Sequence, residues 1–254
     1  MTARRVVPLL IGTQLLDRCV ALGGPPTGTR DRIPIPAFLV ELEDGRTLLW
    51  DTGTDEAALT LPGVFDGDAF PPPDMGLDDL LGARLQAAGC GLDGVDVVGL
   101  SHLMVDHAGG LRHLPGREVI VHADELDYAT GDPDPGCYRR DDYAGPAVEV
   151  RFRTVDGDEE VLPGITVLAT PGHSPGHLSL LVRLASGRSV LIASDAGDLR
   201  ENFDRELPPG ILLAGRERAL ASIRRLCRIA EDTGALLIPG HDPVAWSSLP
   251  AELT

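Results

Sequence analysis

Cysteine is scarce in this chain of 254 residues, and its spacing fits neither a thiolate metal site nor a redox motif. The four cysteines lie far apart, and no two of them have C-x-x-C spacing: Cys19, Cys90, Cys137 and Cys227. Zinc sites built from thiolates and thiol–disulfide enzymes both depend on closely spaced pairs. We therefore expect reduced thiols in a cytoplasmic protein.

Positive charge and long apolar runs are also in short supply. Lys plus Arg is 22 against 39 for Asp plus Glu, which gives a net charge of −17. This balance argues against a nucleic-acid backbone or an anionic membrane as partner. No window approaches the ~20 apolar residues of a membrane helix, and the apolar residues 6–11 are interrupted by Pro8 and too few for a signal-peptide core. A small molecule is the expected partner, and the oligomeric state stays open.

Serine nucleophiles lack their usual setting. Ser101, Ser174 and Ser194 lie close to the stretches described below. Ser101 and Ser194 are not in a G-x-S-x-G sequence, whereas Ser174 has that spacing in Gly172-His173-Ser174-Pro175-Gly176. The residue after the nucleophile must donate its backbone N–H to the oxyanion, and Pro175 has no N–H, so a serine hydrolase is not expected.

The pattern of apolar residues predicts alternating strands and helices, and so an α/β fold in one domain over residues 1–254. Residues 23–36 and 130–146 are predicted to be irregular. Residues 65–79, which contain Pro71, Pro72 and Pro73, are predicted to be a surface loop, either a lid over a pocket or a simple connection. Strands are predicted at 6–11, 37–42, 46–50, 95–100, 118–121, 148–155, 164–169, 178–184, 189–193 and 235–238, and helices at 77–88, 110–114, 123–129 and 216–232.

Histidine or aspartate follows four of the predicted strands, at residues 102–107, 173, 195 and 241. Strand ends that gather at one edge of a sheet are where α/β enzymes build their sites. Imidazole and carboxylate are the ligands that zinc and similar divalent cations prefer. The sequence therefore predicts a metal site at this edge.

The stretches at these strand ends resemble the motifs of the metallo-β-lactamase superfamily, and most of all the branch that opens N-acyl homoserine lactones. The resemblance implies an αββα sandwich, in which two mixed sheets face each other with helices outside. The matching stretches are Asp51-Thr52-Gly53, His102-x-Met104-x-Asp106-His107, Thr170-Pro171-Gly172-His173-Ser174-Pro175-Gly176-His177, Asp195-Ala196 with Glu201-Asn202-Phe203, and Pro239-Gly240-His241-Asp242.

The resemblance also implies a ligand set for two ions. One ion would be held by Asp106, His107 and His241. The other would be held by His102, His173 and the residue at position 104, with Asp195 bridging both ions. Beside them, Asp51 and His177 would support the ligands without binding metal, while His113 and His122 fall outside the pattern.

Two positions depart from that branch. Met104 stands where a histidine is expected, either as a soft thioether ligand or as apolar filler. In both cases we expect one tightly bound zinc ion and a weakened second site. Asp198 lies near the position of a tyrosine that contacts the substrate carbonyl in the lactonases, and the sequence does not show whether Tyr128, Tyr138 or Tyr143 replaces it.

The function implied is a metallohydrolase that opens a lactone or related carboxylic ester through a metal-bound hydroxide. Asp106 would pass a proton to the leaving group, with Asp195 as the second candidate for that role. Two alternatives remain open: a biosynthetic thioesterase or cyclase of the same fold, and a metal-poor homologue that binds a small molecule without turning it over. A β-lactamase is less expected, because no export signal is visible.

Overall fold

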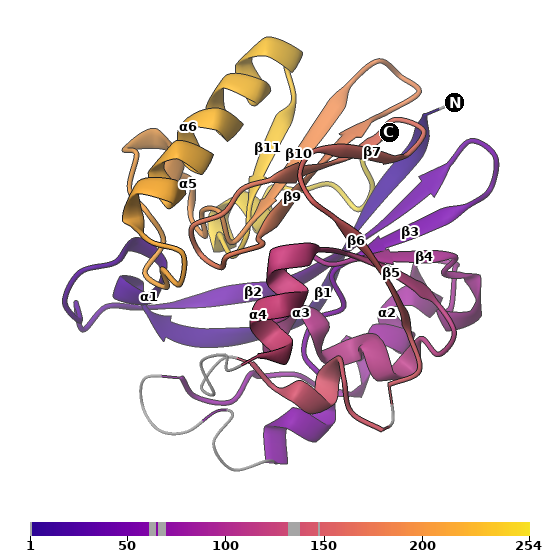
Figure 1. The fold of residues 1–254 in the computed structure, drawn as a ribbon, viewed down its shortest axis with the longest axis horizontal. Coiled ribbons are helices and arrows are strands. Elements are labelled where there is room, and N and C mark those ends of the chain that lie inside the picture. Colours follow the sequence, from indigo (N-terminus) through magenta and orange to yellow (C-terminus); the bar gives the residue numbers. More distant parts are fainter. Residues whose placement is uncertain (1, 61–64, 66–69, 132–137, 147) are drawn as a thin grey trace.

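Two β-sheets face each other in the computed structural model, and helices cover the outer face of each (Figure 1). The structure describes residues 2–60, 65, 70–131, 138–146 and 148–254. One sheet has six strands in the order β1-β2-β3-β4-β5-β6, and the other has five in the order β11-β10-β9-β8-β7. The predicted αββα sandwich is therefore confirmed.

The strands are β1 (Ala3–Asp17), β2 (Arg30–Leu42), β3 (Thr47–Trp50), β4 (Val97–Gly99), β5 (Glu118–His122), β6 (Arg151–Val155), β7 (Glu159–Leu162), β8 (Ile165–Ala169), β9 (Leu178–Arg183), β10 (Ser189–Ser194) and β11 (Leu236–Pro239). The α-helices are α1 (Arg18–Leu22), α2 (Leu81–Ala87), α3 (Val105–Ala108), α4 (Ala123–Thr130), α5 (Arg200–Asp204), α6 (Arg216–Thr233) and α7 (Pro243–Ser247).

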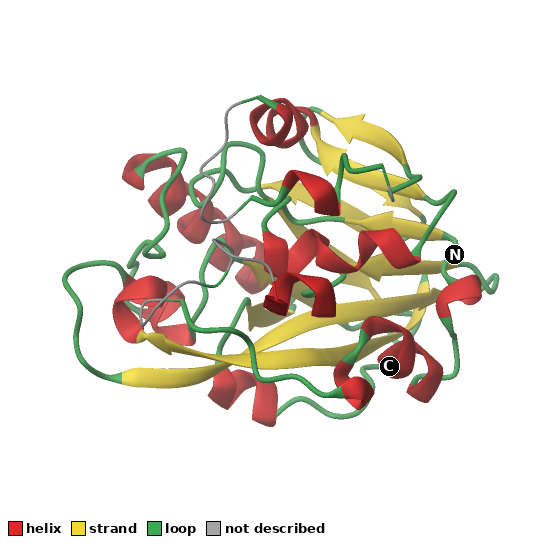
Figure 2. Cartoon of the chain, turned by 90° about the horizontal axis from the view of Figure 1, so that it is seen from below, coloured by secondary structure: helices red, strands yellow, loops and turns green. Residues whose placement is uncertain are grey.

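Three apolar layers hold the sandwich together, and side-chain alternation along the strands explains them. In β2, Phe38 and Val40 face the space between the sheets, while Leu39 faces α2 and α4. In β10, Ile192 faces the same inner space, while Leu191 packs under α6. Figure 2 shows helices lying across the strands on the outer side of a sheet. Both faces of each sheet are thus buried.

A polar contact joins the two sheets close to their ligand-bearing edge. The indole Nε1 of Trp50, at the end of β3, donates a 3.1 Å hydrogen bond to Ser194 Oγ, at the end of β10. Trp50 is fully buried, and its indole N–H is satisfied by this contact, as a buried indole requires. The contact fixes one strand end of each sheet relative to the other.

The predicted loop over residues 23–36 is wrong in its second half, because β2 begins at Arg30 and pairs with β1. Pro34 and Pro36 made a strand look improbable. However, β3 pairs only with residues 38–41 of β2, so both prolines lie where β2 has one neighbour. A proline is tolerated at such an edge, since no second ladder needs its missing N–H. The result is a long β1–β2 hairpin with α1 near its tip.

The predicted helix over residues 77–88 is also too long. Residues 77–79 form a single 3₁₀ turn, Leu80 is extended, and α2 begins at Leu81. Leu77 is 80% exposed, so it does not belong to the apolar face formed by Leu81 and Leu85. The Asp79 carboxylate accepts a hydrogen bond from Gly76 N and closes the separate turn.

The remaining predictions concern short elements, residues that the structure does not describe, the cysteines and membrane helices. The sequence did not predict α1, α3, α5, α7 or β7, which have four or five residues each. Residues 66–69 of the proposed lid and 132–137 of the irregular stretch lie outside the described residues, as does Cys137. Cys19, Cys90 and Cys227 are free thiols. Within the described part of the chain, no helix is both long and apolar enough to cross a bilayer.

Candidate metal centre

The loops that follow β4, β8, β10 and β11 meet at one edge of the sandwich and bring the predicted ligands together. His102, Asp106 and His107 come from the loop after β4 and the short helix α3. His173 follows β8, Asp195 follows β10 and His241 follows β11. Each sheet therefore provides three side chains to one cluster.

The Asp195 carboxylate lies at the centre of the cluster, and its two oxygens face different imidazoles. Asp195 Oδ1 lies 3.3 Å from His107 Nε2 and 3.2 Å from His241 Nε2. Asp106 Oδ2 completes this half at 3.8 and 3.9 Å from the same two ring nitrogens. Two carboxylates and two imidazoles thus converge on one side of Asp195.

On the other side, Asp195 Oδ2 lies 3.5 Å from His173 Nε2 and 3.9 Å from His102 Nε2. The two ring nitrogens are 3.2 Å apart. The sulfur of Met104 lies 3.3 Å from His173 Nε2, beside this half of the cluster. Met104 is also part of the apolar core.

Hydrogen bonds to the far ring nitrogens orient three of the imidazoles toward the cluster. Asp51 Oδ2 lies 3.0 Å from His107 Nδ1, Ser101 Oγ 2.9 Å from His102 Nδ1, and the Pro34 carbonyl 2.8 Å from His241 Nδ1. Such partners fix the ring and leave Nε2 free for a metal ion. Asp51 therefore contacts a predicted ligand from behind, as a supporting residue would.

Buried polar atoms without partners test whether the cluster suits a cation. Among the described residues, His107 Nε2 and Asp195 Oδ1 are buried and make no hydrogen bond. A buried carboxylate oxygen is costly unless a cation or a donor satisfies it. The donor set, imidazole with carboxylate, is the one that zinc takes. The residues present fit a divalent cation.

The electrostatics of the cluster point the same way. Burial disfavours protonation of His241, but the carboxylates of Asp195, Asp198 and Asp106 outweigh it and raise the pKa of the imidazole to about 10. Burial lowers the pKa of His102, and the neighbouring His107 adds to this effect, so His102 is neutral as a ligand must be. The negative charges of the carboxylates therefore favour positive charge inside the cluster. Protons on the imidazoles or bound metal ions can supply that charge.

The remaining histidines and tyrosines are engaged elsewhere. His113 contacts Asp55 at 2.8 Å, and His122 Nδ1 accepts from Asp124 N at the start of α4. His177 lies beside the cluster, with its Nδ1 bonded to Thr170 Oγ1. Tyr138 and Tyr143 donate to Glu125 and to the Ala129 carbonyl, and no tyrosine of the described residues lines the cavity over the cluster.

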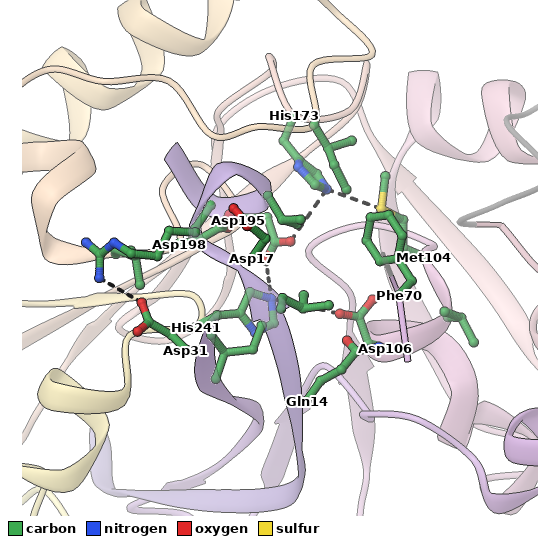
Figure 3. A pocket seen from close by; sticks show the side chains of 18 of the residues that line it. Gln14, Asp17, Asp31, Phe70, Met104, Asp106, His173, Asp195, Asp198 and His241 are labelled. Atoms are coloured by element: carbon green, nitrogen blue, oxygen red, sulfur yellow. Dashed lines mark hydrogen bonds and ion pairs between the residues drawn. The ribbon is translucent and has the colours of Figure 1, made fainter. Parts of the chain in front are cut away.

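That cavity opens to solvent above the cluster and is lined by residues of the strand-end loops and of the β1–β2 hairpin. Met104, Asp106, His173, Asp195, Asp198 and His241 form its floor (Figure 3). Its walls are mainly apolar and include Leu16, Val20, Ala21, Ile33, Phe65, Phe70 and Ile211. The β1–β2 hairpin provides much of this wall. Sequence reasoning missed it, because residues 12–22 were assigned to no element and residues 23–36 were predicted as a loop.

Glu125 is a further residue that the sequence did not single out. It is fully buried on α4 and receives four hydrogen bonds, from Leu103 N, Tyr138 Oη, Ser174 Oγ and Gly176 N, at 2.6 to 3.2 Å. Leu103 belongs to the loop of His102, and Ser174 and Gly176 belong to the loop of His173. Glu125 therefore holds the two loops of this half of the cluster side by side.

Comparison with known proteins identifies the family of the chain. The metallo-beta-lactamase superfamily model matches residues 30–241. An N-acyl homoserine lactonase of Bacillus thuringiensis is 32% identical over 249 residues, covering 95% of this chain and 94% of its own length. The N-acyl homoserine lactonase AttM of Azorhizobium caulinodans is 34% identical over 230 residues, covering 87% and 86%.

A solved structure of an N-acyl homoserine lactone hydrolase, with the product N-hexanoyl-L-homoserine bound at its catalytic metal centre, superimposes with a TM-score of 0.86 at 31% identity and covers 98% of both chains. A lactonase structure from B. thuringiensis with N-decanoyl-L-homoserine at the active site gives the same TM-score, identity and coverage. The chain therefore belongs to the metallo-beta-lactamase superfamily and is similar to its N-acyl homoserine lactonases over nearly its whole length.

Proposed function

We propose that this protein is a metal-dependent hydrolase that opens a lactone or a related carboxylic ester, and that N-acyl homoserine lactones are the first substrates to test. One observation carries the proposal: four imidazoles and two carboxylates converge at the floor of a cavity with apolar walls. The similarity to lactonases of known activity supports the same reaction class.

The six predicted ligands divide into two groups around Asp195. Asp106, His107 and His241 would hold one ion, His102 and His173 the other, and Asp195 would touch both. A bound zinc ion would acidify a water molecule and polarise the substrate carbonyl. The rest of the reaction falls to the protein's own side chains.

Asp106 is the side chain best suited to move a proton. It lines the cavity, and its side chain is 23% exposed, whereas that of Asp195 is 8% exposed and lies between two pairs of imidazoles. When the acyl C–O bond of a lactone breaks, the ring oxygen leaves as an alkoxide and needs a proton. Asp106 can take that proton from the attacking water and deliver it to the alkoxide, while the apolar walls bind an acyl chain and exclude bulk water.

The test is a substrate panel measured with the same purified protein. N-hexanoyl- and N-decanoyl-homoserine lactone, an unacylated γ-lactone, an aryl ester, an acyl thioester and a β-lactam would be compared by the acid each reaction releases. We expect acyl lactones to react fastest, chelation to abolish turnover and added zinc to restore it. His241→Ala should be inactive, and His113→Ala, which alters a histidine outside the cluster, should behave as the native protein.

Other outcomes separate the alternatives. Preference for the thioester would assign a thioesterase instead of a lactonase. Binding of acyl lactones without turnover, in protein that contains no metal, would assign a sequestering protein and contradict the proposal.

A further inference from the structure

Asp198 carries a buried carboxylate that none of the roles described so far uses. It lies in the loop after β10, three residues beyond Asp195, and is 7% exposed. One of its oxygens, Oδ1, is buried and has no hydrogen-bond partner among the described residues. In Figure 3 the side chain lies next to Asp195 at the floor of the cavity.

The geometry places Asp198 within reach of an ion at the cluster. A carboxylate oxygen of Asp198, one of Asp195 and a ring nitrogen of His241 all lie within 4.8 Å of one another. Ligands that share an ion at about 2.0–2.2 Å lie up to about 4.4 Å apart, so the three atoms can converge on one ion after small side-chain rotations. Asp198 is held in this position by its backbone carbonyl, which accepts a 2.8 Å hydrogen bond from His241 N.

Asp198 shares the charge of one imidazole, His241, with the carboxylates of Asp195 and Asp106. The arginine of the cavity, Arg18, is occupied by Asp31 and Glu201, at 2.7 Å each. The buried carboxylate of Glu125, by contrast, has donors on both of its oxygens. Three neighbouring carboxylates that face one imidazole at a buried site favour a cation that joins them.

We propose that Asp198 is itself a metal ligand, which adds a carboxylate oxygen to the ion held by His241, Asp195, Asp106 and His107. This inference rests on the metal binding proposed above. The ion in that half then has three carboxylates and two imidazoles around it, whereas the other half has a thioether in place of an imidazole. The chain therefore strengthens one position and weakens the other.

Metal affinity and the spectrum of bound cobalt test this proposal without any measurement of activity. Native protein, Asp198→Asn and the control Asp204→Asn would be freed of metal, checked for folding by circular dichroism, and titrated with Zn²⁺ and Co²⁺. Asp204→Asn removes one negative charge six residues further along, at an exposed residue of α5 that does not line the cavity.

We expect Asp198→Asn to weaken the tighter ion by about tenfold or more and to change the visible absorption of bound Co²⁺, because its ligand set changes. Asp204→Asn should stay within about twofold of the native protein and keep its spectrum. If the asparagine variant does not fold, the same result is expected of Asp198→Ala.

Unchanged affinity or an unchanged cobalt spectrum in the Asp198 variant would show that the carboxylate is not a ligand, while the proposed function would stand. A native protein that binds neither ion would overturn both proposals.

Discussion

Met104 places a thioether beside one half of the cluster, and this gives the first prediction at the scale of a residue. Its sulfur faces His173 Nε2 at 3.3 Å, but its stem is packed in the core with Leu100 and Leu103. With a thioether in place of an imidazole, the half that contains His102 and His173 should bind zinc weakly. A second divalent ion would make the site two charge units more positive than a single ion does, and a less positive site stabilises an oxyanion less.

Met104→His should therefore raise the zinc content from about one ion per chain toward two and increase the rate of lactone opening. Elemental analysis of both proteins side by side measures this. Met104→Leu serves as control, because it keeps the apolar volume and removes the sulfur. Lower zinc content in that variant would identify the thioether as a ligand, and unchanged content would identify it as filler. Two full zinc equivalents in the native protein would refute the weakened site.

Glu125 gives a second prediction at the scale of a residue. Glu125→Gln replaces one acceptor oxygen by an amide N–H₂, which would face donors that now bond to the carboxylate. Leaving buried donors unsatisfied costs about 1–3 kcal/mol each, so urea unfolding should show a loss of about 2–4 kcal/mol. Asp127→Asn, on the exposed side of the same helix, should change little. Equal stability of the two variants would contradict a supporting role for Glu125.

The sequence predicted which side chains form the cluster but not what holds them. His102, His107, His173, Asp195 and His241 were found because each follows an apolar strand, and strand ends share an edge. Glu125 gave no such signal, since a glutamate in the first turn of a helix is usually exposed. Its role depends on a contact between α4 and the loop after β8, which only tertiary packing creates.

Among the elements, the β1–β2 hairpin differs most from expectation and matters most for the cavity. At the tip of this hairpin, the carboxylate of Asp17 caps the start of α1 by accepting a hydrogen bond from Cys19 N. It also accepts hydrogen bonds from Thr27 N and Gly28 N, and the three distances are 2.7 to 3.0 Å. Local propensity could not reveal this hairpin. Pro34 and Pro36 are compatible with β2 only because β3 is too short to pair with that part of the strand.

Asp17→Asn should loosen residues 18–29 and so increase their amide hydrogen exchange. The backbone N–H groups of Cys19 and Thr27 lower the pKa of Asp17 in the folded protein. Its ionised form thus stabilises the tip above about pH 4, and this contribution is lost as the pH falls through the lowered value. The difference from native protein should be constant from about pH 5 to 8 and shrink in acid. Asp44→Asn, in the β2–β3 turn, should leave residues 18–29 unaffected.

The loop of His173 makes a tight contact with α6, which gives an element-scale prediction. Gly172 has φ 151°, and a Cβ there would lie 2.3 Å from Ala219 Cα. Gly172→Ala must push the loop away from the helix, at a cost of about 1–3 kcal/mol or more, and should lower zinc affinity by displacing His173. Gly187→Ala is the matched control, because its φ of 88° is also unfavourable but its Cβ meets no atom within 4 Å. Similar zinc affinities in both variants would exclude the displacement.

At the scale of the whole molecule, the cluster lies on the seam between the two sheets. Three ligands belong to each sheet, so a bound ion would join the two halves of the sandwich. A ligand that binds only the folded state stabilises it by about 2.7 kcal/mol at 100 times its Kd. Zinc should therefore raise the melting temperature of chelated protein by several degrees, and by less in Asp106→Asn. A melting temperature that does not respond to zinc would contradict binding across the seam.

The scarcity of tryptophan in this chain has a practical consequence. The chain has two tryptophans. Trp246 is partly buried and packs against Phe38, whereas Trp50 is hydrogen-bonded to Ser194, the residue before Asp195. In Trp246→Phe, all tryptophan fluorescence comes from a ring one contact away from the central carboxylate. Adding zinc to that variant should change its emission and reach a plateau at the stoichiometry found by elemental analysis. Trp50 would then report, in real time and without any label, each ion that enters or leaves.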